Sequence, residues 1–311
     1  MTGTLWQRLA RGVRRLQQRP EWTLFAGPDW ADRIMTAAVT DRFHAKQGRS
    51  IGRWTLHAHG HRLTVYLKRH YRLSWWRGVL ATLWPAANWS PALQEWQHLE
   101  WARKQGLPVP TAFAAGEFIG PWGRLQSFLA VEELHEMLPL HEAVPAAAAR
   151  LDAASFARWK RGLAAEMARL VRDLHSRHWF HKDLYLCHFY IHIGDTSQTP
   201  QWPGRVHLID LHRLGHHAWS RRWWQVKDLA QLLYSSAVTG VTGRDRWRFW
   251  RAYHGKEEKG ENGRLTGFSR SLADGWLRRM ILIRWGRYQR HNAKRKRLGQ
   301  GRGPTDYRQP T

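Results

Sequence analysis

The stretch HKDLYLCH (residues 181–188), followed by LID (residues 208–210), decides the predicted fold. Asp183 and Asp210 each stand at the end of a predicted apolar strand. A phosphotransferase of the kinase type needs two such acids, because one accepts the proton of the attacking hydroxyl and the other holds magnesium against the nucleotide phosphates. The pattern therefore predicts Asp183 as the catalytic base and Asp210 as the main magnesium ligand.

Three polar neighbours of Asp183 are predicted to assist it. His181 would hold the loop by hydrogen bonding, or it is a histidine at the edge of the core. Lys182 would neutralise charge on the transferring phosphoryl group, or it is a surface lysine. His188 occupies the position where a kinase usually carries a magnesium-binding Asn, so it would contact the metal or a phosphate, although magnesium prefers oxygen ligands. Asp228 is either a helix N-cap or a brace for the catalytic loop, and the brace is preferred.

The nucleotide side is predicted from the N-terminal part of the chain. Lys68 closes an apolar strand, and Glu95 in the first turns of the next helix is its expected partner, in preference to Glu100. Gly48 and Gly52 bound a candidate phosphate loop that lacks a third glycine, so the same residues fit an ordinary turn.

The element order predicts a β-rich unit with one helix, followed by a larger helical unit. The expected strands cover 54–58 and 63–68, joined as a hairpin, then 113–118 and 125–132. The expected helices cover 91–105, 157–175 and two segments within 223–252. Three segments are expected to be less regular: a loop or short helix at 71–90, an Ala-rich connection or surface helix at 143–154, and a polar loop at 255–264. The predicted domains are an amphipathic segment 1–20, units 21–134 and 135–290, and a basic disordered tail 291–311.

Composition narrows the partners. Lys and Arg number 50 against 24 for Asp and Glu, and there are 21 Trp residues. A protein with such an excess of positive charge is expected to bind a polyanion, which could be nucleic acid, anionic lipid or a phosphorylated glycolipid. The single cysteine, Cys187, excludes an intramolecular disulfide and a Cys-based zinc site, and fits a reducing compartment. We expect no transmembrane helix, because no stretch of about 18 apolar residues exists, and no signal peptide, because residues 1–20 lack an apolar run followed by a small-residue cleavage site.

Residues 1–20 are predicted to form a basic amphipathic helix. Its apolar positions fall on one helical face: Leu5, Trp6, Leu9, Val13 and Leu16. Arginines lie largely around the other face. Such a helix either lies on an anionic membrane or packs on the domain with its basic face in solvent.

Four motifs together resemble the lipopolysaccharide kinase (Kdo/WaaP) family, in particular its core heptose kinases. They are HKDLYLCHF (181–189), IDLHR (209–213), KDL (227–229) and YSS (234–236), and the resemblance runs from about residue 43 to about residue 253. It implies an α+β, protein-kinase-like fold of two lobes, with a hinge near Glu133 that contacts the nucleotide. It also implies phosphorylation of a heptose or Kdo hydroxyl of the lipopolysaccharide inner core, with ATP and Mg²⁺ as cofactors. Lys182 stands where the family typically has Arg.

The resemblance further implies a cytoplasmic protein, peripheral at the inner face of the cytoplasmic membrane. Its partners would be lipopolysaccharide or another anionic glycolipid and the membrane surface, with no nucleic acid expected.

Other functions remain open at this point. A tyrosine or serine protein kinase would use the same Lys68, Asp183 and Asp210. A nucleic-acid-binding module is supported by the charge but opposed by the two acids, which repel phosphate unless metal is present. A pseudokinase scaffold would be favoured if one of the three residues were missing, and all three are present. The oligomeric state is not predicted.

Overall fold

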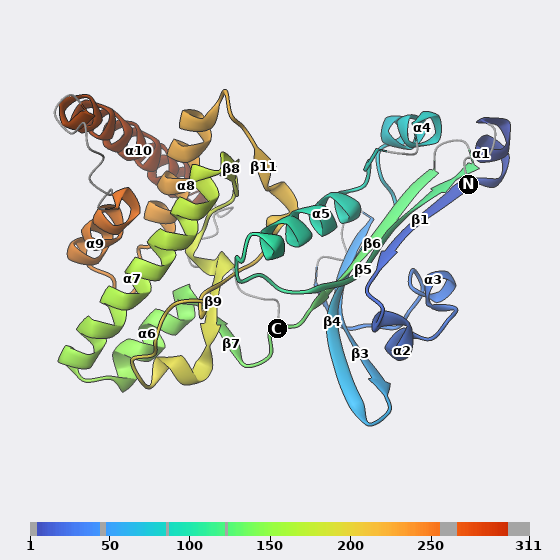
Figure 1. Cartoon of the computed structure of the whole chain (residues 1–311), viewed down its shortest axis with the longest axis horizontal. Helices are drawn as coiled ribbons and strands as arrows, with labels where there is room; N and C mark the ends of the chain where they lie inside the picture. The colour runs from blue at the N-terminus through green and yellow to red at the C-terminus, as the bar shows by residue number, and fades with distance from the viewer. Residues whose placement is uncertain (1–4, 44–47, 85–86, 122–123, 256–265, 298–311) are drawn as a thin grey trace. The chain divides into compact units, whose positions relative to one another are not determined.

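The computed structural model describes residues 5–43, 48–84, 87–121, 124–255 and 266–297 (Figure 1). The chain divides into two compact units, one ending at His135 and the other beginning at Glu136. The first unit is rich in strands and the second is mainly helical. This arrangement confirms the predicted α+β class.

The first unit is built on one antiparallel sheet of six strands. They are β1 (Val13–Gln18), β2 (Thr40–Phe43), β3 (Arg49–Ala58), β4 (His61–His70), β5 (Ala112–Gly120) and β6 (Arg124–Glu132). Their order across the sheet is β1-β5-β6-β4-β3-β2. The predicted hairpin is confirmed: Ala58 pairs with His61, and the two turn residues between them both have positive φ, as a tight two-residue hairpin turn requires.

Strand alternation places Lys68 on a defined face of β4. Val65 and Leu67 are fully buried and belong to a core cluster that contains Trp22 and Trp30. Successive side chains of a strand point to opposite faces, so Lys68 points away from that cluster, and its side chain meets helix α5.

Five α-helices accompany the sheet among the described residues. They are α1 (Leu5–Arg11), α2 (Trp22–Ala26), α3 (Trp30–Arg33), α4 (Trp75–Leu83) and α5 (Pro91–Lys104). Two of them, α2 and α3, lie where no helix was predicted. Helix α5 matches the predicted helix, with Ser90 capping it by accepting a hydrogen bond from the Leu93 N–H. Within the 71–90 region, α4 is the short helix that was one of the two expected alternatives, and residues 85–86 lie outside the described residues.

One expectation about the first unit is wrong, and a second segment has a different conformation from the one expected. The helix over residues 1–20 ends at Arg11, because Gly12 takes a left-handed φ of 77° that lets the chain turn into strand β1 beside β5. The predicted phosphate loop 48–52 is mostly strand: Gly52 lies inside β3, where a Cβ would collide with Val39, and only Gly48 lies in the turn. Residues 44–47, in the connection from β2 to β3, are outside the described residues.

Among its described residues, the second unit contains five α-helices and two small groups of short strands. The helices are α6 (Leu140–Arg150), α7 (Ala153–Ser176), α8 (Arg221–Ser235), α9 (Gly243–His254) and α10 (Thr266–Arg297). The strands are β7 (Met137–Pro139), β8 (Trp179–Phe180), β9 (Phe189–His192), β10 (His207–Leu208) and β11 (Gly215–His216). They form a β10-β9-β7 sheet and a β11-β8 pair.

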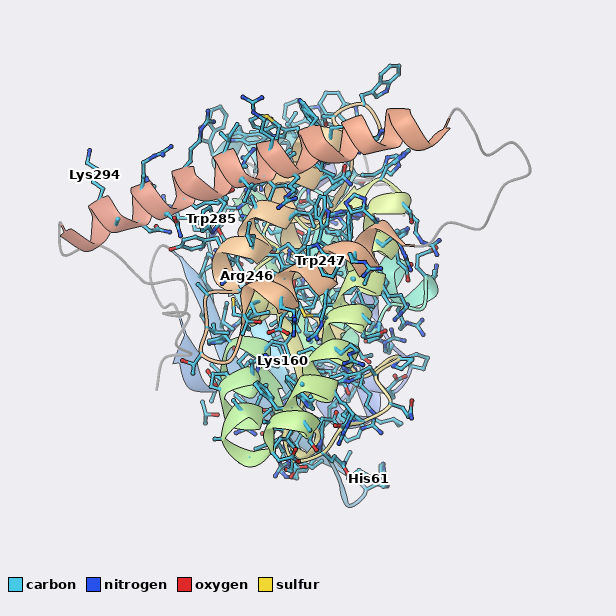
Figure 2. The ribbon with its side chains drawn as sticks, turned by 90° about the vertical axis from the view of Figure 1, so that its left-hand side faces the viewer. His61, Lys160, Arg246, Trp247, Trp285 and Lys294 are labelled. Atoms are coloured by element: carbon cyan, nitrogen blue, oxygen red, sulfur yellow. The ribbon has the colours of Figure 1, made fainter. Side chains whose placement is uncertain are left out.

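Two more predictions need correction here. The Ala-rich stretch belongs to helix α6, which begins at Leu140, before the predicted start, and buries one side, including Val144 and Ala147, while the other side is partly exposed. The tail predicted as disordered from residue 291 is helical as far as Arg297, where the long helix α10 ends (Figure 2). Helix α10 contacts α8, with Leu277 and Ile281 buried and the Asn292 amide donating to the Tyr234 hydroxyl. Residues 298–311 and most of the predicted 255–264 loop lie outside the described residues. No helix in the part of the chain that the structure describes is long and apolar enough to cross a membrane.

Candidate active site

Helix α8 holds the loop that carries Asp183. The buried carboxylate of Asp228 accepts hydrogen bonds from the backbone N–H groups of His181 and Lys182, each at 2.8 Å. Ser235, further along the same helix, accepts from the Leu186 N–H at 2.8 Å. Because Asp228 lies inside α8, it is not an N-cap, and its contacts are those of a brace for the loop.

A second set of contacts joins the Asp183 loop to the chain before Asp210. Strands β9 and β10 pair, and the Ile209 N–H donates to the His188 carbonyl at 2.9 Å. The Nε2 atom of His181 donates to the Ile209 carbonyl at 3.0 Å. These bonds keep the two predicted acids in one framework, and they put His181 where it can hold the loop.

The Asp183 carboxylate is contacted by side chains that the sequence did not assign to it. One guanidinium nitrogen of Arg213 lies 3.1 Å and 2.9 Å from its two oxygens, and the Gln231 amide lies 3.4 Å away. The Lys182 ammonium does not lie on this carboxylate but over the Trp224 ring, 5.1 Å from its centre. Arg213 falls inside the IDLHR motif, which was the only sequence signal for it.

Asp210 has a different environment. It has a left-handed backbone, with φ of 62°, and its carboxylate accepts from His212 Nδ1 at 2.6 Å. The other carboxylate oxygen lies 3.7 Å from His188 Nε2. About a third of the side chain is exposed, so solvent and a ligand can reach it.

His188 is neutral at physiological pH. Burial, and then the neighbouring His181, lowers its pKa to about 4. A neutral imidazole has one N–H, and its Nδ1 lies 2.7 Å from the Asp183 carbonyl, so Nδ1 carries the hydrogen. The lone pair of Nε2 therefore faces the Asp210 carboxylate, and the two electron-rich atoms favour a cation beside them.

The donors around Asp210 fit magnesium better than a metal held by protein alone. No group of three or more His, Cys, Asp or Glu that could hold a metal ion occurs among the described residues. Magnesium usually takes one or two carboxylates and completes its shell with water and substrate phosphates. Asp210 supplies such a carboxylate, whereas His188 supplies a less preferred nitrogen.

The first unit contains the predicted lysine and glutamate in contact. Lys68 Nζ lies 2.7 Å from Glu95 Oε1. Glu100, the rejected alternative, pairs with Arg19 and Arg103 instead. The carboxylate of Glu133 is paired with Arg53 at 2.8 Å, so this side chain is engaged within the first unit.

Positive charge gathers beside Asp183. We call Lys182, Arg213 and Lys227 the cation cluster. The ammonium groups of Lys182 and Lys227 lie over Trp224, and burial followed by repulsion from Arg213 lowers the pKa of each lysine. The sequence contains no acid between Asp210 and Asp228. The cluster is therefore a place where an anionic group of a ligand would be favoured.

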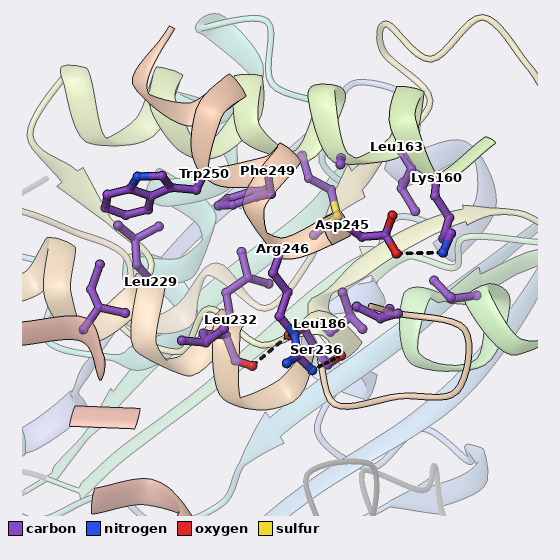
Figure 3. Close-up of a pocket in the computed structure, with 16 residues that line it drawn as sticks. Lys160, Leu163, Leu186, Leu229, Leu232, Ser236, Asp245, Arg246, Phe249 and Trp250 are labelled. Carbon is purple, nitrogen blue, oxygen red and sulfur yellow. Dashed lines mark hydrogen bonds and ion pairs between the residues drawn. The ribbon is translucent and has the colours of Figure 1, made fainter. Parts of the chain in front are cut away.

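An apolar cavity of about 140 Å³ lies elsewhere in the second unit (Figure 3). Its few polar groups are satisfied internally: Lys160 pairs with Asp245 at 2.6 Å, and Arg246 donates to Ser236 at 3.0 Å. Neither Asp183 nor Asp210 lines it. Such a lining suits no nucleotide phosphate, so this cavity is separate from the candidate active site. Cys187 is a buried thiol, and its burial raises its pKa to about 12, so it stays protonated.

Comparison with known proteins gives concordant matches. The model of the lipopolysaccharide kinase (Kdo/WaaP) family matches residues 37–253. A lipopolysaccharide core heptose(I) kinase WaaP from Pseudomonas aeruginosa is 32% identical over 212 residues, covering 65% of this chain and 74% of that protein. A protein of the same name from Escherichia coli is 31% identical over 195 residues, covering 60% and 70%. A solved structure, WaaP in complex with acyl carrier protein, has a TM-score of 0.60 and 27% identity, over 86% of this chain and 98% of that one.

Proposed function

Because the chain belongs to the lipopolysaccharide kinase (Kdo/WaaP) family, we propose that it transfers the γ-phosphate of ATP, with Mg²⁺, to a heptose or Kdo hydroxyl of the inner core. The chain is a lipopolysaccharide core kinase, a phosphotransferase with a sugar hydroxyl as acceptor. The observation that carries the finer proposal is the framework that holds Asp183 and Asp210 together while giving their carboxylates different partners.

In the proposed reaction, Asp183 orients the acceptor hydroxyl and accepts its proton as the phosphoryl group is transferred. Arg213 fixes the direction of this carboxylate through two contacts. His181 and Asp228 hold the loop backbone, and Gln231 limits the rotation of the acid.

On the nucleotide side, Lys68 would contact the ATP phosphates, with Glu95 setting the direction of the ammonium group. Gly48 and Gly52 keep their proposed place near the phosphates, and Glu133 its place at the hinge. Asp210 would hold magnesium, with His188 beside it. Magnesium, when bound, would neutralise charge that develops on the phosphates.

The cation cluster supports an acceptor that already carries negative charge. Among the described residues, the acids that act on Lys182 and Lys227 are Asp228, which accepts hydrogen bonds from the loop backbone, and, for Lys227, the proposed base Asp183. We propose that phosphate or carboxylate groups of the core oligosaccharide lie against this cluster, with Lys182 also free to approach the transferring phosphoryl group.

The proposed cellular place is the cytoplasmic side of the inner membrane, where a glycolipid acceptor is anchored. Acyl carrier protein, the partner named in the related WaaP structure, is a proposed partner of this chain also. Co-purification of tagged chain with acyl carrier protein, and its loss at high salt, would test that partner separately from catalysis.

The function is tested by magnesium-dependent transfer of labelled γ-phosphate from ATP to dephosphorylated lipopolysaccharide. A generic protein substrate and a reaction without acceptor serve as controls. Label on the glycolipid alone, lost in Asp183→Asn, is the expected result. Label on protein alone would replace this function with that of a protein kinase, and no label with ATP bound would point to a scaffold without activity.

A further inference from the structure

Helices α1 and α4 lie together at one end of the first unit (Figure 1). One side of α4 is fixed to the rest of the unit, because Gly78, Ala81 and Thr82 are buried. Ala81 belongs to a small core cluster with Ile119 and Leu125 of the sheet. Helix α4 is therefore packed against the sheet through one of its sides.

The other side of α4 and the start of α1 expose large apolar side chains. Trp6 is 76% exposed, Trp75 75% and Trp84 59%. Trp76, Leu83 and Leu5 are also exposed. We call these six residues the α1–α4 face. Large apolar groups gathered on two neighbouring helices are unusual on a surface that meets only water, and they mark a site of interaction.

The two chain segments that build this face carry no acidic residue. The sequence contains no Asp or Glu from residue 1 to residue 20, and none from residue 42 to residue 94. Arg11 and Arg72 are exposed, and the Arg77 guanidinium lies 5.2 Å from the centre of the Trp76 ring. Indole rings bordered by arginine are suited to the boundary between anionic headgroups and acyl chains.

We propose that the α1–α4 face docks on an anionic lipid bilayer, with its tryptophans at the headgroup boundary and its arginines against lipid phosphates. The charge complementarity selects a bilayer over an uncharged apolar partner. Helix α4 has nine residues and a single charged side chain, Arg77, so it is far too short to span and is suited to lying in the interface. The inference extends the proposed function, because a glycolipid acceptor is presented at such a surface, but docking itself needs neither ATP nor acceptor.

Vesicle flotation tests the proposal directly. The full chain is mixed with vesicles of phosphatidylglycerol and phosphatidylcholine, or of phosphatidylcholine alone, without nucleotide. Trp75→Ser/Trp84→Ser should reduce partitioning onto the anionic vesicles by about tenfold or more. The matched control, Trp219→Ser/Trp247→Ser, removes two exposed tryptophans of the second unit and should change partitioning by less than about twofold.

A charge variant separates the two contributions. Arg11→Glu/Arg72→Glu should lower binding to the anionic vesicles and weaken its dependence on salt, while leaving the low binding to phosphatidylcholine unchanged. Thermal melting of every variant checks that the chain is folded. Equal losses in the α4 variant and its control would overturn the proposal. So would an α4 variant that still floats but no longer binds acyl carrier protein, since the face would then be a protein interface.

Activity on a water-soluble core oligosaccharide keeps this inference apart from the proposed function. The Trp75→Ser/Trp84→Ser variant should phosphorylate that acceptor at the unaltered rate while losing activity on acceptor embedded in vesicles. A chain that floats but phosphorylates no core sugar would overturn the proposed function and leave the docking face standing.

Discussion

Asp183 and Asp210 lie in the same unit but differ in the charges that surround them. A permanent cation, Arg213, lies against the carboxylate of Asp183. The carboxylate of Asp210 is flanked by two histidines, and one of them, His188, is kept neutral by burial. A permanent cation thus lies against the Asp183 carboxylate, whereas imidazole groups lie beside the Asp210 carboxylate. This difference in local charge supports the proposed roles of Asp183 as base and Asp210 as metal ligand.

The largest expected effect comes from Asp183→Asn, which keeps the shape of the side chain but removes the proton acceptor. The kcat on lipopolysaccharide should fall by about 10²–10⁴-fold, the contribution typical of a general base. The KM for ATP should stay within about twofold, since this variation touches no uniform binding contact. Steady-state kinetics with labelled ATP would measure both constants.

Asp173→Asn is the matched control for this experiment, because Asp173 is a partly exposed acid of α7 that pairs with Arg169 away from the loop. Its kcat should equal that of the unaltered chain. If Asp183→Asn kept more than about a tenth of the activity, the base would have to be another group.

Unlike Asp183→Asn, the Asp210→Asn variant should have an activity that depends on the magnesium concentration more strongly than that of the unaltered chain. Activity at fixed magnesium should fall on the order of a hundredfold, because a magnesium ligand with full charge becomes a neutral amide. Raising magnesium, or replacing it with manganese, should recover part of this loss but none of the loss in Asp183→Asn. A magnesium titration with an unaltered midpoint would remove the distinction between the two acids.

Asp228→Asn tests the brace of the Asp183 loop. The amide group can accept one of the two backbone hydrogen bonds but presents an NH₂ to the other N–H, and it loses the charge that strengthens both. Urea denaturation should show an unfolding free energy lower by about 2–4 kcal/mol. Asp173→Asn should change it by less than about 0.5 kcal/mol. Equal changes in the two variants would mean that the buried carboxylate is not what holds the loop.

Some features of the fold and of the candidate site could be predicted from the sequence, and others could not. The brace and the Lys68–Glu95 pair were predictable because short motifs fix the residue types, and helix and strand periodicity fixes the faces on which they lie. Residues 13–18 were not, because their spacing also fits a helix and the partner strand β5 is remote in the chain. In the sequence, the local sign that the helix ends before residue 13 is the glycine at position 12, which takes a left-handed φ in the structure. Charge and tryptophan content predicted an interaction surface but could not say which helices build it.

Arg213 is the residue whose role the sequence concealed, because nothing local shows that an arginine reaches a carboxylate thirty residues earlier. Arg213→Met should lower kcat/KM by only about three- to tenfold, since the side chain is half exposed and such pairs are weak. Removing its charge should also raise the pKa of Lys182 and Lys227, because Arg213 lowers both. If those lysines act as cations, the alkaline fall in kcat/KM should then begin at a higher pH than in the unaltered chain.

A double-mutant cycle gives the sharper form of this test. If Arg213 acts by orienting Asp183, then Arg213→Met should cost much less in the Asp183→Asn background, where there is no base to orient. An equal cost in both backgrounds would mean that Arg213 contacts the substrates directly. Arg213 would then act with the rest of the cation cluster in binding an anionic group of the substrate. Asp183 and Asp210 would in that case differ because one lies beside a proposed anion site and the other beside a proposed metal site.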